Sequence, residues 1–136
     1  MSRLMSVSLT EDAVRSRSKT VTRRKGWIFL KAGDRLTLCR KVMGRTRGEP
    51  LVRIAEVEVV SVRREPLMAI TDEDVARECV PLIDAHGHER FDEVWIPDGG
   101  RWSQAQPATW AWVSWFAFEM GCLPETDVTR IEWRYL

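Results

Sequence analysis

A run of basic and hydroxyl side chains near the start of the chain is the segment best suited to chemistry. Residues 16–27 read SRSKTVTRRKGW and hold five cations and two threonines, with no carboxylate. Ammonium, guanidinium and hydroxyl groups gathered together suit a phosphate group or a polarised carbonyl. The alternative is a solvated strand edge, whose charges prevent pairing with another chain. Composition alone favours the strand edge.

The arrangement of these side chains follows from an extended backbone. Thr20, Thr22 and Arg24 then lie on one face of the segment, and Lys19 and Arg23 lie on the other. Alternation breaks down where a strand begins, so Lys19 can turn in beside Thr22. The segment therefore offers a lysine and a threonine hydroxyl that could act on the same ligand.

A carboxylate to accompany these cations is found in Glu78. It lies near the end of a helix predicted over residues 71–79, where the helix dipole disfavours an anion. A glutamate in that place is either exposed to solvent or held by a cation. As a single glutamate, it is more often a solvated helix residue.

Histidine and cysteine give weaker indications. His86 and His88 form an H-x-H pair, but no third ligand is evident, so a polar loop is favoured over a metal site. Cys39, Cys79 and Cys122 are far apart and have no ligand-like spacing, which favours free thiols in a reducing compartment. We expect neither a metal nor a cofactor.

Tryptophan is unusually frequent, with seven in 136 residues. Trp102, Trp110, Trp112 and Trp115 could offer stacking platforms for bases, but helical spacing favours a core role. Trp27 is the better candidate for a stacking contact, because it follows directly after the basic run that ends in Lys25 and Gly26. Common phosphate-loop, serine-esterase, zinc-protease and zinc-finger motifs do not occur in the sequence.

Length and charge indicate a single domain spanning residues 1–136. Lys and Arg number 21 against 20 Asp and Glu, which excludes a globally basic nucleic-acid coat but leaves room for a local basic site. No apolar run approaches the ~20 residues of a membrane span, and no signal-peptide core is present at the N-terminus. We therefore expect a soluble, cytoplasmic protein.

The elements that must position these residues are mostly strands. Period-two alternation and β-branched residues predict strands, and Thr71 and Gly121 mark helix ends. Thr10 is a plausible cap for a short helix. The predicted strands cover residues 6–9, 20–24, 35–42, 51–64 and 128–136, and the predicted helices cover residues 11–17, 71–79 and 107–121. Residues 82–106 read as irregular, so the pattern predicts a compact, barrel-like domain.

The order of four segments resembles a known family. They are SVSLT…AVRSRSKTVTRR, LKAGDRL, ITDEDVARECVP and VTRIEWRYL. Their order is similar to that in the ASCH domain family, above all in its short stand-alone members from actinobacteria and their phages. The likeness covers residues 6–81 and 107–136. It implies an α+β fold: a small PUA-like β-barrel of about five or six strands with two or three helices.

The resemblance also implies a site. In the family, a basic segment faces a helix glutamate across a cleft, and some members are amidohydrolases of N4-acetylcytidine while others are ribonucleases. Lys19, Thr22 and Glu78 match the residues that family amidohydrolases use for catalysis. A desolvated lysine could take the proton of the threonine hydroxyl, and the glutamate could hold the lysine. Further ligand-binding candidates are Thr20, Arg23, Arg24, Lys25 and Trp27.

Two departures from the family bear on this expectation. Short relatives have E-G-F-P after the helix glutamate where this chain has ECVP, and residues 82–106 resemble an insertion. Three functions therefore stay open. The first is binding of RNA or a modified nucleoside. The others are amide hydrolysis or RNA cleavage in the same cleft, and protein interaction through the tryptophan-rich helix and the insertion.

Overall fold

The computed structural model describes residues 2–80 and 108–136, and it has an α+β fold. Five strands form one sheet in the order β1-β3-β4-β5-β2. The strands are β1 (Arg3–Ser6), β2 (Val21–Arg24), β3 (Arg35–Cys39), β4 (Arg53–Pro66) and β5 (Asp127–Tyr135). The α-helices are α1 (Glu11–Arg15), α2 (Asp72–Glu78) and α3 (Ala108–Met120), and the 3-10 helices are η1 (Ser8–Thr10) and η2 (Leu67–Ala69).

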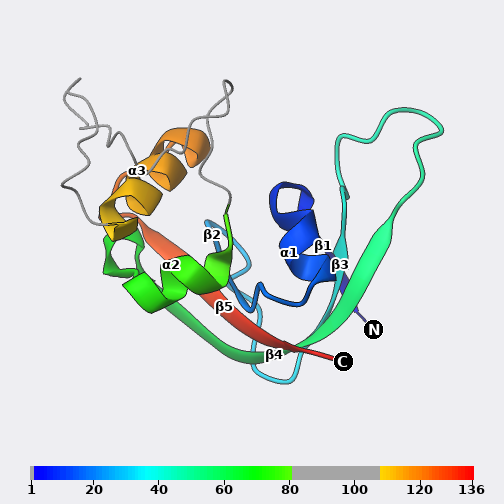
Figure 1. Cartoon of the computed structure of the whole chain (residues 1–136), viewed down its shortest axis with the longest axis horizontal. Coiled ribbons are helices and arrows are strands. Elements are labelled where there is room, and N and C mark those ends of the chain that lie inside the picture. Colours follow the sequence, from blue (N-terminus) through cyan, green and yellow to red (C-terminus); the bar gives the residue numbers. More distant parts are fainter. Residues whose placement is uncertain (1, 81–107) are drawn as a thin grey trace.

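The sheet curls into a half-barrel because its longest strand, β4, bends along its length (Figure 1). The first part of β4 pairs with β3, and the part from Val57 onward pairs with β5. A register shift between Val59 and Ser61 interrupts the second pairing. Such irregularities bend a strand and increase its twist. The expectation of an α+β, barrel-like fold with five or six strands and two or three helices is confirmed.

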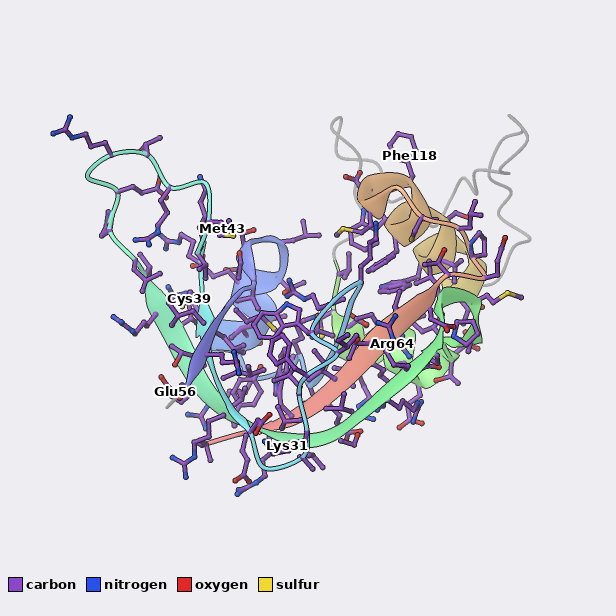
Figure 2. The ribbon with its side chains drawn as sticks, turned by 180° about the vertical axis from the view of Figure 1, so that it is seen from behind. Lys31, Cys39, Met43, Glu56, Arg64 and Phe118 are labelled. Atoms are coloured by element: carbon purple, nitrogen blue, oxygen red, sulfur yellow. The ribbon has the colours of Figure 1, made fainter. Side chains whose placement is uncertain are left out.

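Two hydrophobic clusters stabilise the fold. One fills the concave side of the half-barrel, and its members include Met5, Leu36, Leu38 and Trp133. The other lies under α3 and joins that helix to η2 and β5 through Leu67, Trp112, Phe116 and Val128. Apolar residues also occur on the outer side of α3, where Phe118 is exposed (Figure 2).

The N-terminal elements differ from the prediction. The first strand covers residues 3–6 instead of 6–9, because it pairs in parallel with β3 and leaves the sheet at a 3-10 turn over residues 8–10. This pairing joins segments about 30 residues apart, which local alternation does not reveal. The predicted helix 11–17 ends earlier, at Arg15, and Arg17 adopts a positive φ of 64°.

The remaining elements agree with the prediction within a few residues. Thr71 caps α2 by accepting a hydrogen bond from the Asp74 backbone N–H. Thr10 precedes α1 as expected, but its side chain makes no capping bond. The insertion predicted at residues 82–106 lies outside the described residues. In the described ranges 2–80 and 108–136, no helix has the length and apolar character needed to cross a bilayer.

Candidate functional site

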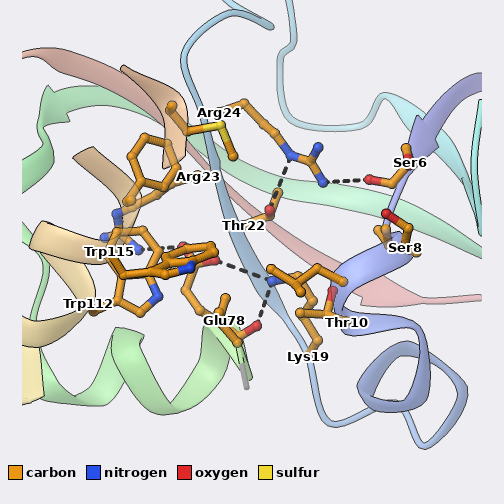
Figure 3. A pocket seen from close by; sticks show the side chains of 15 residues that line it. Ser6, Ser8, Thr10, Lys19, Thr22, Arg23, Arg24, Glu78, Trp112 and Trp115 are labelled. Atoms are coloured by element: carbon orange, nitrogen blue, oxygen red, sulfur yellow. Dashed lines mark hydrogen bonds and ion pairs between the residues drawn. The ribbon is translucent and has the colours of Figure 1, made fainter. Parts of the chain in front are cut away.

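A pocket of about 180 Å³ opens where the two edge strands of the half-barrel approach each other (Figure 3). The segment after β1 forms one side, α3 forms the opposite side, and β2 and the end of α2 form the floor. The lining residues are Ser6, Val7, Ser8, Leu9, Thr10, Lys19, Thr22, Arg23, Arg24, Glu78, Val80, Trp112, Trp115, Phe116 and Met120. The basic segment and the helix glutamate thus reach one cavity.

Backbone pairing brings α2 against the start of β2. The Thr20 N–H donates to the Arg77 carbonyl over 3.2 Å, which places the last turn of α2 beside Lys19. Cys79 then takes a left-handed conformation with φ 56° and ends the helix. The helix therefore ends with its carbonyl groups and Glu78 directed toward the basic segment.

Lys19 and Glu78 form a buried pair at the base of the pocket. Lys19 Nζ donates to the Glu78 carbonyl oxygen over 2.6 Å and to Glu78 Oε1 over 3.3 Å, and each side chain is only 2% exposed. Burial lowers the pKa of Lys19 below its ordinary value, while the negative charge of Glu78 acts in the opposite direction. The alternatives of a solvated strand edge and a solvated helix glutamate are wrong for these two residues.

Arg23 holds the other side of the Glu78 carboxylate. Its Nη1 donates to Glu78 Oε2 over 3.1 Å, and its Nη2 donates to Asp74 Oδ2 over 2.6 Å. Asp74 also accepts two hydrogen bonds from Arg130, at 2.6 and 3.0 Å. Hydrogen bonds from Arg130, which have the larger effect, and from Arg23 hold the pKa of Asp74 well below its ordinary range. Glu78 is therefore fixed from two directions.

Thr22 lies in the pocket with Arg24 as its partner. Arg24 Nε donates to Thr22 Oγ1 over 3.3 Å, and Arg24 Nη2 donates to the Ser6 carbonyl over 2.8 Å. Arg24 thereby links the two edge strands, β2 and β1, across the opening of the half-barrel. Between Lys19 and Thr22, the described part of the chain contains no hydrogen bond. The structure places the two side chains in one pocket without joining them.

An aromatic wall from α3 completes the cavity. Trp112 and Phe116 stack with ring centroids 5.2 Å apart, and Trp115 meets Trp112 edge-on at 5.9 Å. Trp112 is 1% exposed, which confirms its predicted core role. Core packing and ligand contact, which the sequence presents as alternatives, are combined here, because Trp112 and Trp115 belong to the packing of α3 and also line the pocket.

Three predicted binding residues lie outside the pocket lining. The Thr20 hydroxyl accepts a hydrogen bond from Arg77 Nε, and exposed Lys25 donates to the Met120 carbonyl. Trp27 packs on the core of the half-barrel and beside Phe29. Arg24 is therefore the last residue of the basic run that lines the pocket, because the backbone turns away from the pocket where β2 ends.

Sequence reasoning missed Ser6, Ser8 and Thr10 as pocket residues. Ser6 and Ser8 fall in the predicted strand 6–9 and Thr10 is a predicted helix cap, so no sequence pattern marks the three as ligand-binding. His86, His88 and Trp102 fall outside the described residues. Within residues 2–80 and 108–136, no group of three or more histidine, cysteine or acidic side chains could hold a metal ion.

The fold and the pocket define an α+β half-barrel protein with a charged cavity between its edge strands. A crystal structure of protein EF3133 from Enterococcus faecalis V583, of the family DUF984, has a similar fold, with a TM-score of 0.58 at 11% sequence identity. The similarity covers 100% of this chain and 80% of that one. No family model and no curated protein matches the chain. At this identity, the likeness shows the fold alone.

Proposed function

We propose that the pocket binds a single modified pyrimidine base, either of a free nucleoside or of a residue in RNA. The observation that carries this proposal is the buried Lys19–Glu78 pair beside the wall formed by Trp112 and Trp115. Proteins recognise unpaired bases by stacking them on aromatic rings and by hydrogen bonding to their edges. A volume of about 180 Å³ admits a ring-sized group, since an engineered apolar cavity of ~150 Å³ binds benzene.

The charge of the pocket supports a nucleic-acid ligand. Its lining includes three cations, Lys19, Arg23 and Arg24, and one carboxylate, Glu78. The order of sequence segments that resembles the ASCH family agrees with this proposal, since that family includes RNA-binding and nucleoside-processing members. A binding function needs only the cations, hydroxyls and aromatic rings already in place.

Hydrolysis of an N4-acylated cytidine is the second candidate, and burial of Lys19 favours it. A lysine whose pKa is lowered holds more of its neutral, proton-accepting form near pH 7. In the reaction, a water molecule or Thr22 Oγ1 attacks the acyl carbonyl while Lys19 accepts the nucleophile's proton. The bond between the acyl carbon and N4 then breaks, and the proton passes from Lys19 to the leaving amine. Attack by water gives acetate and cytidine directly; attack by Thr22 gives an acyl-threonine that a second water hydrolyses.

The geometry favours water over Thr22 as the nucleophile. Lys19 bonds to Glu78, and Thr22 bonds to Arg24, so Thr22 lacks the direct contact with a base that an activated hydroxyl requires. Arg24 lies beside Thr22 and is a cation that could stabilise the oxyanion formed by the attack.

The first prediction tests binding and turnover with N4-acetylcytidine. We expect calorimetry to detect binding, and Lys19→Met or Glu78→Gln to weaken it at least tenfold, because each leaves a buried partner unpaired. Released acetate, measured by chromatography, distinguishes hydrolysis from binding. The matched control is Lys31→Met, since Lys31 is exposed and pairs with Asp34 on the surface.

Each outcome of that experiment has a definite meaning. Binding without acetate release contradicts hydrolysis and leaves the binding function. Absence of binding by folded wild-type protein, to N4-acetylcytidine and to single-stranded RNA containing it, contradicts the proposed function. RNA affinity should fall with salt with a log–log slope of roughly −0.7 per phosphate contact.

A further inference from the structure

Arg24 differs from the other cations of the pocket in its partners. Lys19 pairs with Glu78, and Arg23 pairs with Glu78, Asp74 and Glu65. Within the described ranges, Arg24 donates only to neutral acceptors, the Thr22 hydroxyl and the Ser6 carbonyl. In the part of the chain that the structure describes, no carboxylate forms an ion pair with it. Among residues 2–80 and 108–136, its charge therefore has no carboxylate in direct contact, and Glu78 acts on it only through space.

Burial makes this charge unusual. Arg24 is partly buried, and burial lowers its pKa from the ordinary value, although a guanidinium stays protonated at physiological pH. A desolvated cation is costly unless an anion accompanies it. The two hydrogen bonds to Thr22 and Ser6 use two of the five N–H donors of a guanidinium. Among the described residues the remaining donors have no partner, so they can serve an anionic ligand.

The pocket has two chemically different sides. Ser6, Ser8 and Thr10 lie beyond Arg24 and Lys19, whereas Trp112 and Trp115 lie across the cavity (Figure 3). Hydroxyl groups beside an arginine are typical partners of phosphate oxygens. An aromatic ring can therefore occupy one side while an anion occupies the other. Ser8 and Leu9 are exposed, so this anionic side opens to solvent.

We infer that the ligand of the pocket is a nucleotide, with its phosphate at Arg24 and the hydroxyls of Ser8 and Thr10, and its base at the aromatic wall. This inference rests on the proposed function and narrows it from nucleosides to phosphorylated ligands. The phosphate belongs either to a free nucleoside monophosphate or to a residue within RNA, and both present the same chemistry to Arg24.

The test compares ligands that differ only in phosphate. Dissociation constants are measured for N4-acetylcytidine, its 5′-monophosphate and a trinucleotide with N4-acetylcytidine in the middle. We expect the monophosphate to bind at least about tenfold more tightly than the nucleoside, because charge-assisted hydrogen bonds are stronger than neutral ones. Arg24→Gln should bring this ratio close to one, and Arg24→Lys should retain part of it.

The ratio of the two dissociation constants, for nucleoside and monophosphate, shows whether Arg24 recognises phosphate or has only a structural role. If Arg24 serves only to link β1 and β2, Arg24→Gln weakens both ligands equally and the ratio is unchanged, which overturns the inference. The matched control is Arg35→Gln, because Arg35 is exposed on β3 outside the pocket lining, and its ratio should equal that of the wild type. If Arg24→Gln does not fold, Arg24→Lys and the salt dependence of the wild-type ratio provide the readout.

The remaining outcomes distinguish the two levels of the proposal. Equal affinity of the wild type for nucleoside and monophosphate overturns the nucleotide inference and leaves the proposed function standing. No binding of any of the three ligands overturns both. A trinucleotide that binds as tightly as the monophosphate identifies RNA as the source of the phosphate, whereas weaker binding identifies the free nucleotide.

Discussion

At the scale of single residues, Asp74 is central to the arrangement of the site. It joins Arg23 and Arg130, and Arg23 in turn holds Glu78 against Lys19. All of these side chains are at most 5% exposed. A buried network of this kind is costly to assemble, but the loss of one member leaves its partners charged and unpaired.

Asp74→Asn should therefore destabilise the protein strongly. Removing one partner of a buried ion pair typically costs about 3–5 kcal/mol. We expect chemical denaturation to show a loss of about this size. The control is Glu73→Gln on the same helix, whose side chain is 80% exposed and lies 3.9 Å from Arg77. A surface pair of this kind contributes about 0–1 kcal/mol, so equal effects of the two substitutions would contradict the role assigned to Asp74.

At the scale of elements, α2 positions both carboxylates of the network. The helix is only seven residues long, and short helices depend on their ends and on packing for stability. Thr71 caps its start through the Asp74 N–H, and Cys79 ends it in the left-handed conformation. Asp74 and Glu78 are one turn apart and so lie on the same side of the helix.

Loss of the Thr71 cap should weaken the whole site. Thr71→Ala removes the acceptor of the 3.2 Å bond from the Asp74 N–H, which should cost about 1 kcal/mol. For a domain of 136 residues, we expect the melting temperature to fall by about 4 °C in calorimetry. Thr71→Ser keeps the acceptor and should melt near the wild type. If both variants melt alike, the cap does not contribute as described.

Sequence patterns predicted the elements whose signals are local. Alternation marked the strands later named β3 and β5, and the Thr71 capping pattern marked α2, because these signals span only a few residues. Parallel pairing of β1 with β3 depends on contacts about 30 residues apart and was missed. The pairing of Lys19 with Glu78 joins residues 59 apart, and it was expected only from the family resemblance. No local pattern revealed the link from Arg24 to Ser6.

At the scale of the whole molecule, stability should depend on acid pH. Arg130 and Arg23 lower the folded-state pKa of Asp74, and Arg40 and Arg15 lower that of Glu11 to about 2 from an ordinary 4.5. A carboxyl with a lowered pKa stabilises the fold fully above its unfolded pKa, and this contribution is lost as pH falls through the folded one. The free energy of unfolding should therefore decline below about pH 4.5.

Denaturation curves measured between pH 7 and pH 2 can check this prediction. The wild type should lose stability steadily below about pH 4.5, whereas Asp74→Asn should show a shallower decline, because one of the responsible carboxyls is absent. Parallel pH profiles for the two proteins would contradict the assignment of this acid sensitivity to Asp74.

The strand order has a consequence for the time at which the pocket is completed during synthesis. β2, which carries Thr22, Arg23 and Arg24, pairs along its length with β5, the most C-terminal of the described strands. The Lys19 carbonyl likewise accepts a hydrogen bond from Trp133 Nε1 on β5. A ribosome-bound chain that lacks β5 has the basic segment and α2, but it lacks the strand with which β2 pairs. The nascent protein should therefore acquire ligand affinity only after β5 has left the exit tunnel.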